Sequence, residues 1–270
     1  MRVPFVKMHG LGNDFVVLDS RATPLPASLT KNSASALADR HTGIGCDQLI
    51  VLEPSAAHAF TMRIYNSDGG EVEACGNATR AVALLHGEAA KIETSGGVLL
   101  LEPTEGGATV DMGHPRFDWD AIPLDYAMDT SAMPVGWDEL ENPIAVNVGN
   151  PHVIFFVDDA DAVHLAALGP EIENDALFPE RINVNVASLL GPDHLKLRVW
   201  ERGTGLTRAC GTGACATAVA GIRKGLTGEK VTVTLPGGDL TVEWREGESI
   251  RMTGPAAESF RGEFEWDDFA

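Results

Sequence analysis

The chain of 270 residues is 44% hydrophobic and 22% charged, a composition typical of soluble globular proteins, and it is long enough for two domains of ordinary size. Its formal net charge of −19 argues against an extended surface for nucleic acid or anionic membrane, because phosphates require a basic patch. The sequence contains neither an apolar run near the ~20 residues of a membrane span nor a signal-peptide core, and its four cysteines are too few for a disulfide scaffold. We therefore expect a cytoplasmic protein with reduced thiols.

The first half of the chain predicts strands, two helices and a hairpin. Residues 12–19 form a Gly-Asn turn followed by an apolar strand that ends at an acidic residue. Helices are expected over Ser33–Arg40 and Gly76–His86, and a hairpin turn at Ser95–Gly97.

The second half repeats this order. Residues 149–158 again combine a Gly-Asn turn with an apolar strand that ends at an acidic residue. Helices are expected over Asp161–Leu168 and Gly211–Arg223. A strand is expected over Val231–Leu235, with a hairpin turn at Pro236–Gly238.

These repeated halves predict two domains, 1–117 and 118–259. The stretch Arg116–Pro143 is rich in Pro, Asp and Trp and poor in periodicity, so we expect it to be the linker. The tail Glu258–Ala270 has no counterpart in the first half. It is expected to be a last strand that crosses back, with 260–270 completing the N-terminal domain.

The most informative motif occurs twice. Ala74-Cys75-Gly76 recurs as Ala209-Cys210-Gly211, 135 residues later, which is half of the chain. Each Cys comes ten positions after an aromatic residue (Tyr65 or Trp200), at the end of a polar, Gly-containing loop and before a predicted helix. Two like halves with two like thiols suggest a pocket with one thiol on each wall. Such a pocket suits the movement of a proton from one face of a carbon to the other.

A thiol at a helix start lies beside backbone N–H groups that have no intrahelical partner. These donors and the helix dipole favour anions, so the pKa of both thiols is expected to lie below its usual ~8.5. A substrate carboxylate would be held by the N–H groups of Gly76, Asn77, Gly211 and Thr212. These N–H groups would stabilise the negative charge that develops at the adjacent α-carbon while one Cys removes its proton and the other supplies one.

Signatures of cofactors and metals are missing. Gly10–Phe15 has Phe where a dinucleotide fingerprint needs its third Gly, and neither a phosphate loop nor a plausible Schiff-base Lys is found. A redox pair or zinc site is disfavoured because the chain has no Cys-x-x-Cys and Cys210-x4-Cys215 lacks ligand spacing. Cys46 and Cys215 are expected to be packed inside. The sequence thus favours chemistry without cofactor or metal.

The motifs resemble those of the diaminopimelate epimerase family over almost the whole chain. Six segments carry the resemblance in chain order: Lys7–Phe15, Asn66–Gly69, Ala74–Asn77, Gly149–His152, Glu201–Gly203 and Ala209–Ala214. The family interconverts LL- and meso-diaminopimelate without pyridoxal phosphate, on the route to lysine and the bacterial cell wall. The resemblance implies an α/β fold of two pseudo-symmetric domains from an internal duplication. Each domain would wrap its strands around a central helix, and the active site would lie in the interdomain cleft.

The resemblance also implies residue roles. Cys75 and Cys210 would be the acid/base pair, and His152 and Glu201 would tune the thiols. The substrate-binding residues would be Asn13, Gln48, Asn66, Gly76, Asn77, Asn150, Asn183, Glu201, Arg202, Gly211 and Thr212. These types suit a substrate with two amines and two carboxylates, because amides both donate and accept and Arg grips a carboxylate in a fork. Of the neighbours Asn183 and Asn185, we favour Asn183 as the one that faces the pocket.

Two segments depart from the family pattern. Cys46 stands where the family more often has a bulky apolar residue, and Ala78–Ala81 replaces a commoner Gly-containing version. Taken alone, each polar residue of the candidate site could also have a purely structural role, such as an Asn in a turn or a hydrogen-bonded His in the core. Three alternatives stay open: a relative that acts on another amino acid such as proline, a thiol redox protein, and a non-catalytic amino-acid-binding module. A homodimer is also expected.

Overall fold

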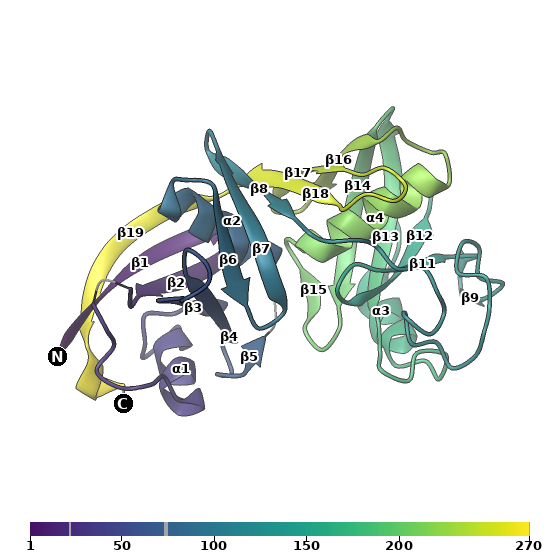
Figure 1. Cartoon of the computed structure of the whole chain (residues 1–270). Coiled ribbons are helices and arrows are strands. Elements are labelled where there is room, and N and C mark those ends of the chain that lie inside the picture. The colour runs from purple at the N-terminus through teal and green to yellow at the C-terminus, as the bar shows by residue number, and fades with distance from the viewer. Residues whose placement is uncertain (22, 73–74, 270) are drawn as a thin grey trace. The chain divides into compact units, whose positions relative to one another are not determined.

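The computed structural model describes residues 1–21, 23–72 and 75–269 (Figure 1). Contacts between Cα atoms divide the chain into two compact units. Unit 1 comprises Met1–Val110 and Gly254–Ala270, and unit 2 comprises Asp111–Thr253. The domain boundaries expected from the sequence fall a few residues beyond these bounds.

Unit 1 is a mixed sheet with two helices. Its neighbouring strands follow the order β19–β1–β2–β3–β4–β6–β7–β8, and the β2–β3 and β4–β6 pairs are parallel. The elements are β1 (Arg2–Gly10), β2 (Asn13–Asp19), α1 (Lys31–Ala38), β3 (Gln48–Glu53), β4 (Thr61–Asn66), β5 (Glu71–Val72), α2 (Gly76–His86), β6 (Ala90–Thr94), β7 (Gly97–Thr104), β8 (Gly107–Asp111), β19 (Ala257–Glu265) and the 3-10 turn η1 (Trp266–Asp268).

Unit 2 has the same plan. Its strands follow the order β11–β12–β13–β14–β16–β17–β18, with β12–β13 and β14–β16 parallel. The elements are β9 (Gly136–Trp137), β10 (Leu140–Glu141), β11 (Ile144–Asn147), β12 (Pro151–Phe156), α3 (Leu165–Glu173), β13 (Asn183–Gly191), β14 (His194–Glu201), β15 (Gly205–Thr207), α4 (Gly211–Arg223), β16 (Lys230–Leu235), β17 (Gly238–Glu243) and β18 (Arg251–Pro255).

The two sheets correspond strand for strand. From β1 and β11 onward, parallel pairs, short side strands and helices come in the same order, and both expected hairpins are present. The internal duplication predicted from the sequence is therefore confirmed. Strand β19 has no counterpart in unit 2, and it lies antiparallel to β1 from Arg2↔Glu265 to His9↔Ala257.

The central helices α2 and α4 begin and end at the predicted residues. Every residue of α4 from Gly213 to Gly221 is buried, and most of them are Ala, Gly or another small residue. A helix that is buried on all sides has to be covered by protein all round. Small side chains let the strands approach it closely, so each sheet wraps around its helix as expected.

Strand alternation separates two cores in unit 1. On β2, Phe15 and Val17 belong to the cluster around α2, whereas Val16 and Leu18 belong to the cluster around α1. Because successive side chains of a strand point to opposite faces, one apolar strand can serve both helices.

The outer helices differ from the expected ranges. Helix α1 starts earlier than Ser33, because Thr30 caps it by exchanging hydrogen bonds with Ser33. The expectation of a helix over Asp161–Leu168 is wrong in its first half. There the Arg198 guanidinium binds the carbonyl oxygens of Ala160 and Val163 at 2.9 and 2.8 Å, which holds the segment as a turn until α3 begins at Leu165.

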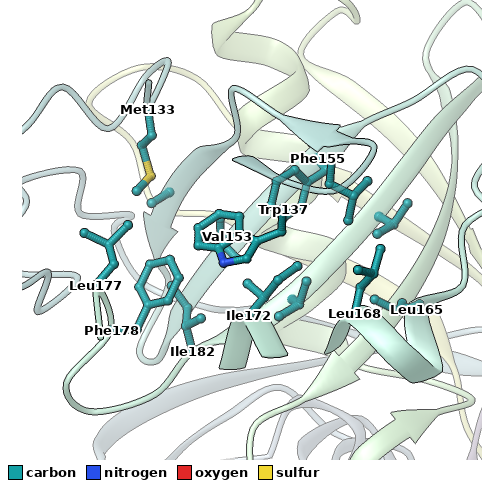
Figure 2. Packing of buried hydrophobic residues seen from close by; sticks show 14 of the residues in the cluster. Met133, Trp137, Val153, Phe155, Leu165, Leu168, Ile172, Leu177, Phe178 and Ile182 are labelled. Atoms are coloured by element: carbon teal, nitrogen blue, oxygen red, sulfur yellow. The ribbon is translucent and has the colours of Figure 1, made fainter. Parts of the chain in front are cut away.

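The segment Arg116–Pro143 is not a linker, which corrects the expectation. It belongs to unit 2, and its large apolar residues enter the main hydrophobic core of that unit. Figure 2 shows Trp137 surrounded by this core, stacked on Phe178 at 5.9 Å and perpendicular to Phe155 at 6.0 Å between ring centroids. Single apolar anchors in irregular chain have no periodicity, so the pattern of the sequence did not reveal their burial.

No helix in the described part of the chain is long and apolar enough to cross a membrane.

We expect Trp137→Ala to lower the free energy of unfolding by about 3–5 kcal/mol, because it removes the largest anchor of this segment and leaves a cavity. Urea denaturation followed by circular dichroism measures the loss. Trp119 of the same segment, with 38% of its surface exposed, provides the matched control. An equal loss in Trp119→Ala would show that the effect does not come from the core.

Candidate active site

The repeated cysteines have the same place and nearly the same backbone conformation in the two units. Cys75 is the N-cap of α2 with φ −148° and ψ 110°, and Cys210 is the N-cap of α4 with φ −133° and ψ 107°. The backbone ladder of each helix starts at the cysteine carbonyl, which accepts from Thr79 N–H at 2.9 Å and from Ala214 N–H at 3.0 Å. The N–H groups between cysteine and ladder therefore point toward the helix start, where an anion is stabilised.

In unit 1 the strand register gathers three predicted site residues at one end of the sheet. Asn13 begins β2, Gln48 begins β3 and Asn66 ends β4. Gln48 lies opposite Phe15 on one side and Asn66 on the other. Gln48 Nε2 donates to Asn66 Oδ1 at 3.0 Å, while the buried Gln48 Oε1 has no hydrogen-bond partner in the structure.

Asn13 connects this sheet end to Cys75. The Cys75 thiol donates to Asn13 Oδ1 over 3.9 Å, and Asn77 Nδ2 donates to the same oxygen at 3.2 Å. Gly76 lies between Cys75 and Asn77 in the first turn of α2. All six site residues predicted for the first half thus lie at or beside one sheet end and the start of α2.

Unit 2 gathers the second set in the same way. Asn150 directly precedes β12, Asn183 begins β13 and Glu201 ends β14, the strand end that Asn66 occupies in unit 1. His152 lies opposite Asn183 in the register. Gly211 and Thr212 form the first turn of α4, directly after Cys210.

His152 is fully buried between two amides. Its Nε2 lies 2.9 Å from Asn150 Oδ1, and its Nδ1 lies beside the Asn185 side-chain amide at 3.2–3.4 Å. Burial lowers the pKa of His152 from 6.5 to about 3, although its contact with Asn185 acts in the opposite direction. The imidazole is therefore neutral at physiological pH and acts through hydrogen bonds.

Cys210 is 4% exposed and lies between donors and a carboxyl group. Gly213 N–H donates to its sulfur at 3.3 Å, and Thr212 Oγ1 lies 3.5 Å away. The thiol also hydrogen-bonds Glu201, whose carboxylate accepts from Thr207 Oγ1 at 2.5 Å.

The expectation of a lowered thiol pKa is wrong for Cys210. Burial raises its pKa well above the usual value, the nearby Glu201 carboxylate raises it further, and the bonds from Thr212 and Gly213 only partly oppose this. Burial also raises the pKa of Glu201. A thiol of raised pKa is a stronger base once it is deprotonated.

Asn183 and Asn185 have different surroundings. Asn183 Nδ2 donates to the Pro151 carbonyl at 2.8 Å, and its Oδ1 accepts from Arg202 N–H at 2.9 Å. The Arg202 guanidinium donates to the Glu180 carbonyl at 3.0 Å. Asn185 is fully buried, and besides its contact with His152 it donates to Gly213 O at 3.5 Å. The substrate-binding roles of Asn183 and Arg202 stay predictions.

Two charged residues at the site were not singled out from the sequence. Asp47 Oδ2 accepts from Asn13 Nδ2 at 2.9 Å, and Arg80 donates to Asn77 Oδ1 at 2.8 Å. Two features of the sequence could have indicated them. Asp47 directly precedes Gln48, and Arg80 is a single charged residue among the small residues of a buried helix.

The His152 environment predicts a pH dependence of stability. In the unfolded chain the imidazole binds a proton below about pH 6.5, whereas in the folded protein it does so only near its pKa of about 3. Its contribution is therefore complete above pH 6.5 and is lost as the pH falls toward 3. We expect His152→Gln to flatten the pH dependence of the unfolding free energy in this window. Urea titrations at several pH values measure it, and equal slopes in both proteins would contradict the predicted burial effect.

Comparisons with known proteins identify the family of this chain. A family model described as diaminopimelate epimerase matches residues 5–117 and 144–258. A diaminopimelate epimerase from Erythrobacter litoralis is 72% identical over 100% of both chains, and one from Sphingopyxis alaskensis is 63% identical over 98% of both. Among solved structures, a phenazine biosynthesis protein of the PhzF family from Enterococcus faecalis matches with a TM-score of 0.70 at 16% identity, over 98% of this chain and 100% of the other, and shows the same fold. The chain belongs to the diaminopimelate epimerase family.

Proposed function

We propose that this protein interconverts LL- and meso-diaminopimelate by a two-base mechanism in which Cys75 and Cys210 exchange protons with the α-carbon. The observation that carries the proposal is the pair of thiols at equivalent helix starts of two duplicated units. The substrate class is supported by close relatives that are named diaminopimelate epimerase over their full length.

The reaction needs one sulfur as thiolate and the other as thiol. The thiolate takes the α-proton, so a C–H bond breaks, an S–H bond forms, and the electron pair stays on the α-carbon beside the carboxylate. The second thiol then delivers its proton to the opposite face, which restores the C–H bond with inverted configuration. In the reverse reaction the two cysteines exchange roles.

The carbanion is the high-energy species that the site has to stabilise. In the proposed complex the substrate carboxylate binds at both helix starts, to the main-chain N–H groups of Gly76, Asn77, Gly211 and Thr212. Fixed donors there meet the negative charge as it develops in the transition state, which is often the largest catalytic contribution. No further group is needed to accept the electron pair.

The surroundings of Cys210 favour a strongly basic sulfur. An α-proton is weakly acidic, so a thiolate of high pKa removes it more readily than one of low pKa. Glu201 and burial supply that high pKa. His152 is connected to the same sulfur through Asn185 and Gly213: Asn185 contacts the imidazole and the Gly213 carbonyl, and Gly213 N–H donates to Cys210. We propose that His152 positions this turn as a neutral ring.

The remaining polar residues would recognise the second amino-acid end of the substrate. The amides of Asn13, Gln48, Asn66, Asn150 and Asn183 offer donors and acceptors, and the unpartnered Gln48 Oε1 is an acceptor for an ammonium group. Glu201 and Arg202 complete the proposed pocket, with Arg202 on the distal carboxylate. We further propose that the enzyme acts in the cytoplasm, in the synthesis of lysine and cell-wall precursors, without cofactor and as a homodimer.

Cys75→Ala and Cys210→Ala should each lower the rate of epimerisation at least about 100-fold, because inversion requires an acid and a base on opposite faces. Deuterium incorporation at the α-carbon of diaminopimelate in D₂O, followed by mass spectrometry and chiral chromatography, measures it. Cys46→Ala is the matched control, since Cys46 is buried beneath β2 and outside the proposed pair. Full inversion by either single variant would exclude the two-base mechanism, and equal exchange into proline would reassign the substrate.

A disulfide between the two thiols should form on mild oxidation and abolish activity, with recovery on reduction, because the mechanism brings both sulfurs to one carbon atom. Peptide mapping by mass spectrometry identifies the Cys75–Cys210 link. Oxidised, inactive protein that contains only other cysteine products would contradict the shared site.

A further inference from the structure

Four side chains in unit 1 form a continuous hydrogen-bonded row. Asp47 Oδ2 accepts from Asn13 Nδ2 at 2.9 Å, Asn13 Oδ1 accepts from Asn77 Nδ2 at 3.2 Å, and Asn77 Oδ1 accepts from the Arg80 guanidinium at 2.8 Å. We call Asp47, Asn13, Asn77 and Arg80 the amide row. The Cys75 thiol contacts it at its centre, through Asn13 Oδ1.

The charged residues at the two ends of the row fix the orientation of both amide groups. An ionised Asp47 accepts only, so it binds the NH₂ side of Asn13; Arg80 donates only, so it binds the oxygen side of Asn77. With both ends charged, the amides align in one direction. A flipped Asn13 would bring its oxygen against a carboxylate, and a flipped Asn77 would bring NH₂ against a guanidinium. Hydrogen bonds to charged groups are stronger than those between neutral groups, so either flip is disfavoured.

Both ends are themselves held in place. Asp47 Oδ1 accepts from Arg40 at 2.7 Å, and its main-chain N–H donates to Asp14 Oδ1 at 2.9 Å. Arg80 is fully buried and donates to the Pro255 carbonyl at 3.4 Å and to the Gly76 carbonyl at 3.5 Å. These contacts fix the positions of the two end groups, while the direction of the amides follows from what the Asp47 carboxylate and the Arg80 guanidinium can accept or donate.

We propose that Asp47 and Arg80 are positioning residues that fix the direction of the amide row, so that a carbonyl oxygen and not an NH₂ group faces the Cys75 sulfur. This inference rests on the proposed role of Cys75 as a base. An oxygen beside the sulfur stabilises the protonated thiol and disfavours the thiolate, so the thiolate is a stronger base toward the weakly acidic α-proton. An NH₂ group in the same place would donate to the thiolate and weaken it.

In unit 2 a different group places an oxygen beside the cysteine sulfur. Positions equivalent to Asn77 and Arg80 hold Thr212 and Cys215, the second and fifth residues of α4. Here the oxygen that faces the sulfur belongs to Glu201. Each thiol of the proposed pair therefore has an oxygen acceptor as neighbour, an amide in one unit and a carboxylate in the other.

In the described part of the chain, charged and titratable groups lie behind Asp47 and on the strands that pack against α2. Arg40, Asp14 and Lys7 lie behind Asp47, where Lys7 Nζ binds Asp14 Oδ2 at 2.6 Å. Of the elements that pack on α2, β1 also carries Arg2 and His9, β7 carries Glu102, and β19 carries Glu258, Arg261, Glu263 and Glu265. The effect of Asp47 on the orientation of Asn13 has to be separated from the effect of its charge on the electrostatic field at Cys75. The control variant is chosen for this purpose.

The test is Asp47→Asn, which keeps the size of the side chain and lets it donate as well as accept. An amide has one oxygen, for which Arg40 on one side competes with Asn13 and the Asp14 main-chain N–H on the other, because that N–H donates to Asp47 Oδ2 at 3.1 Å. The Asn13 amide is then no longer held in one orientation. We expect the pH midpoint for alkylation of Cys75 by iodoacetamide, read on its peptide by mass spectrometry, to fall by on the order of one unit. Arg80→Met should shift it in the same direction by less, because Asp47 still holds Asn13, and Arg80→Lys should restore much of the effect.

Arg40→Gln is the matched control, since it alters the charge next to Asp47 and keeps the carboxylate that binds Asn13. It should leave the Cys75 midpoint within a few tenths of a unit of the wild type, whereas an equal shift would assign the effect to the general field and overturn the proposal. Unshifted midpoints in folded Asp47→Asn and Arg80→Met would also overturn it. Alkylation is read without substrate, so a shifted midpoint in a protein that exchanges no α-proton would reject the proposed function and leave the orientation intact.

Discussion

The constraint on which the structure depends is the enclosure of a small-residue helix by its own sheet. In each unit the strands close around a helix whose buried residues are mostly small, from Gly213 to Gly221 in α4 and from Ala78 to Ala83 in α2, where the buried Arg80 is the exception. This enclosure brings the helix start to the ends of three strands, where polar side chains collect. The thiol at the N-cap then meets a polar side chain from a strand end, Asn13 of β2 in unit 1 and Glu201 of β14 in unit 2.

The duplicated backbones carry divergent side chains, and this divergence distinguishes the two thiols. Strand register makes Phe15 equivalent to His152 and Ile50 equivalent to Asn185. One unit thus fills the space beside its helix with an apolar pair, and the other fills it with a buried polar pair. Fully buried polar groups are costly unless they are paired, so the hydrogen bonds of His152 and Asn185 hold this part of unit 2 in one arrangement.

Much of the fold could be predicted from the sequence because its signals are local and repeated. Helices α2 and α4 combine a cap-like Cys-Gly start with a run of small residues, and their predicted bounds agree with the structure. The hairpins follow from their glycine-rich turns. Helix α3 was misplaced because Arg198, distant in sequence, binds the carbonyl groups of the preceding turn. The anchoring of Trp137 likewise depends on partners such as Phe155 and Phe178 that no local pattern reveals.

The placement of the candidate site residues at strand ends and helix starts was predictable from the sequence, whereas their electrostatics were less so. Residues such as Asn13, Asn66 and Glu201 stand at strand ends that the motifs themselves mark. The helix start alone suggested an acidic thiol, but the pKa of Cys210 is raised, because burial and a neighbouring carboxylate outweigh the donors. Desolvation depends on the whole packed structure, so spacing within a motif cannot give its magnitude.

The pairing of β19 with β1 has a consequence for how the protein is made. Unit 2 is inserted between two parts of unit 1, and the edge partner of the very first strand is the last strand of the chain. During translation, β1 therefore leaves the ribosome long before its neighbour exists, with one row of backbone groups open to other chains. The backbone of β19 closes that edge only after all of unit 2 has been made, and the charged residues of β19 and the buried Trp266 after it then complete unit 1.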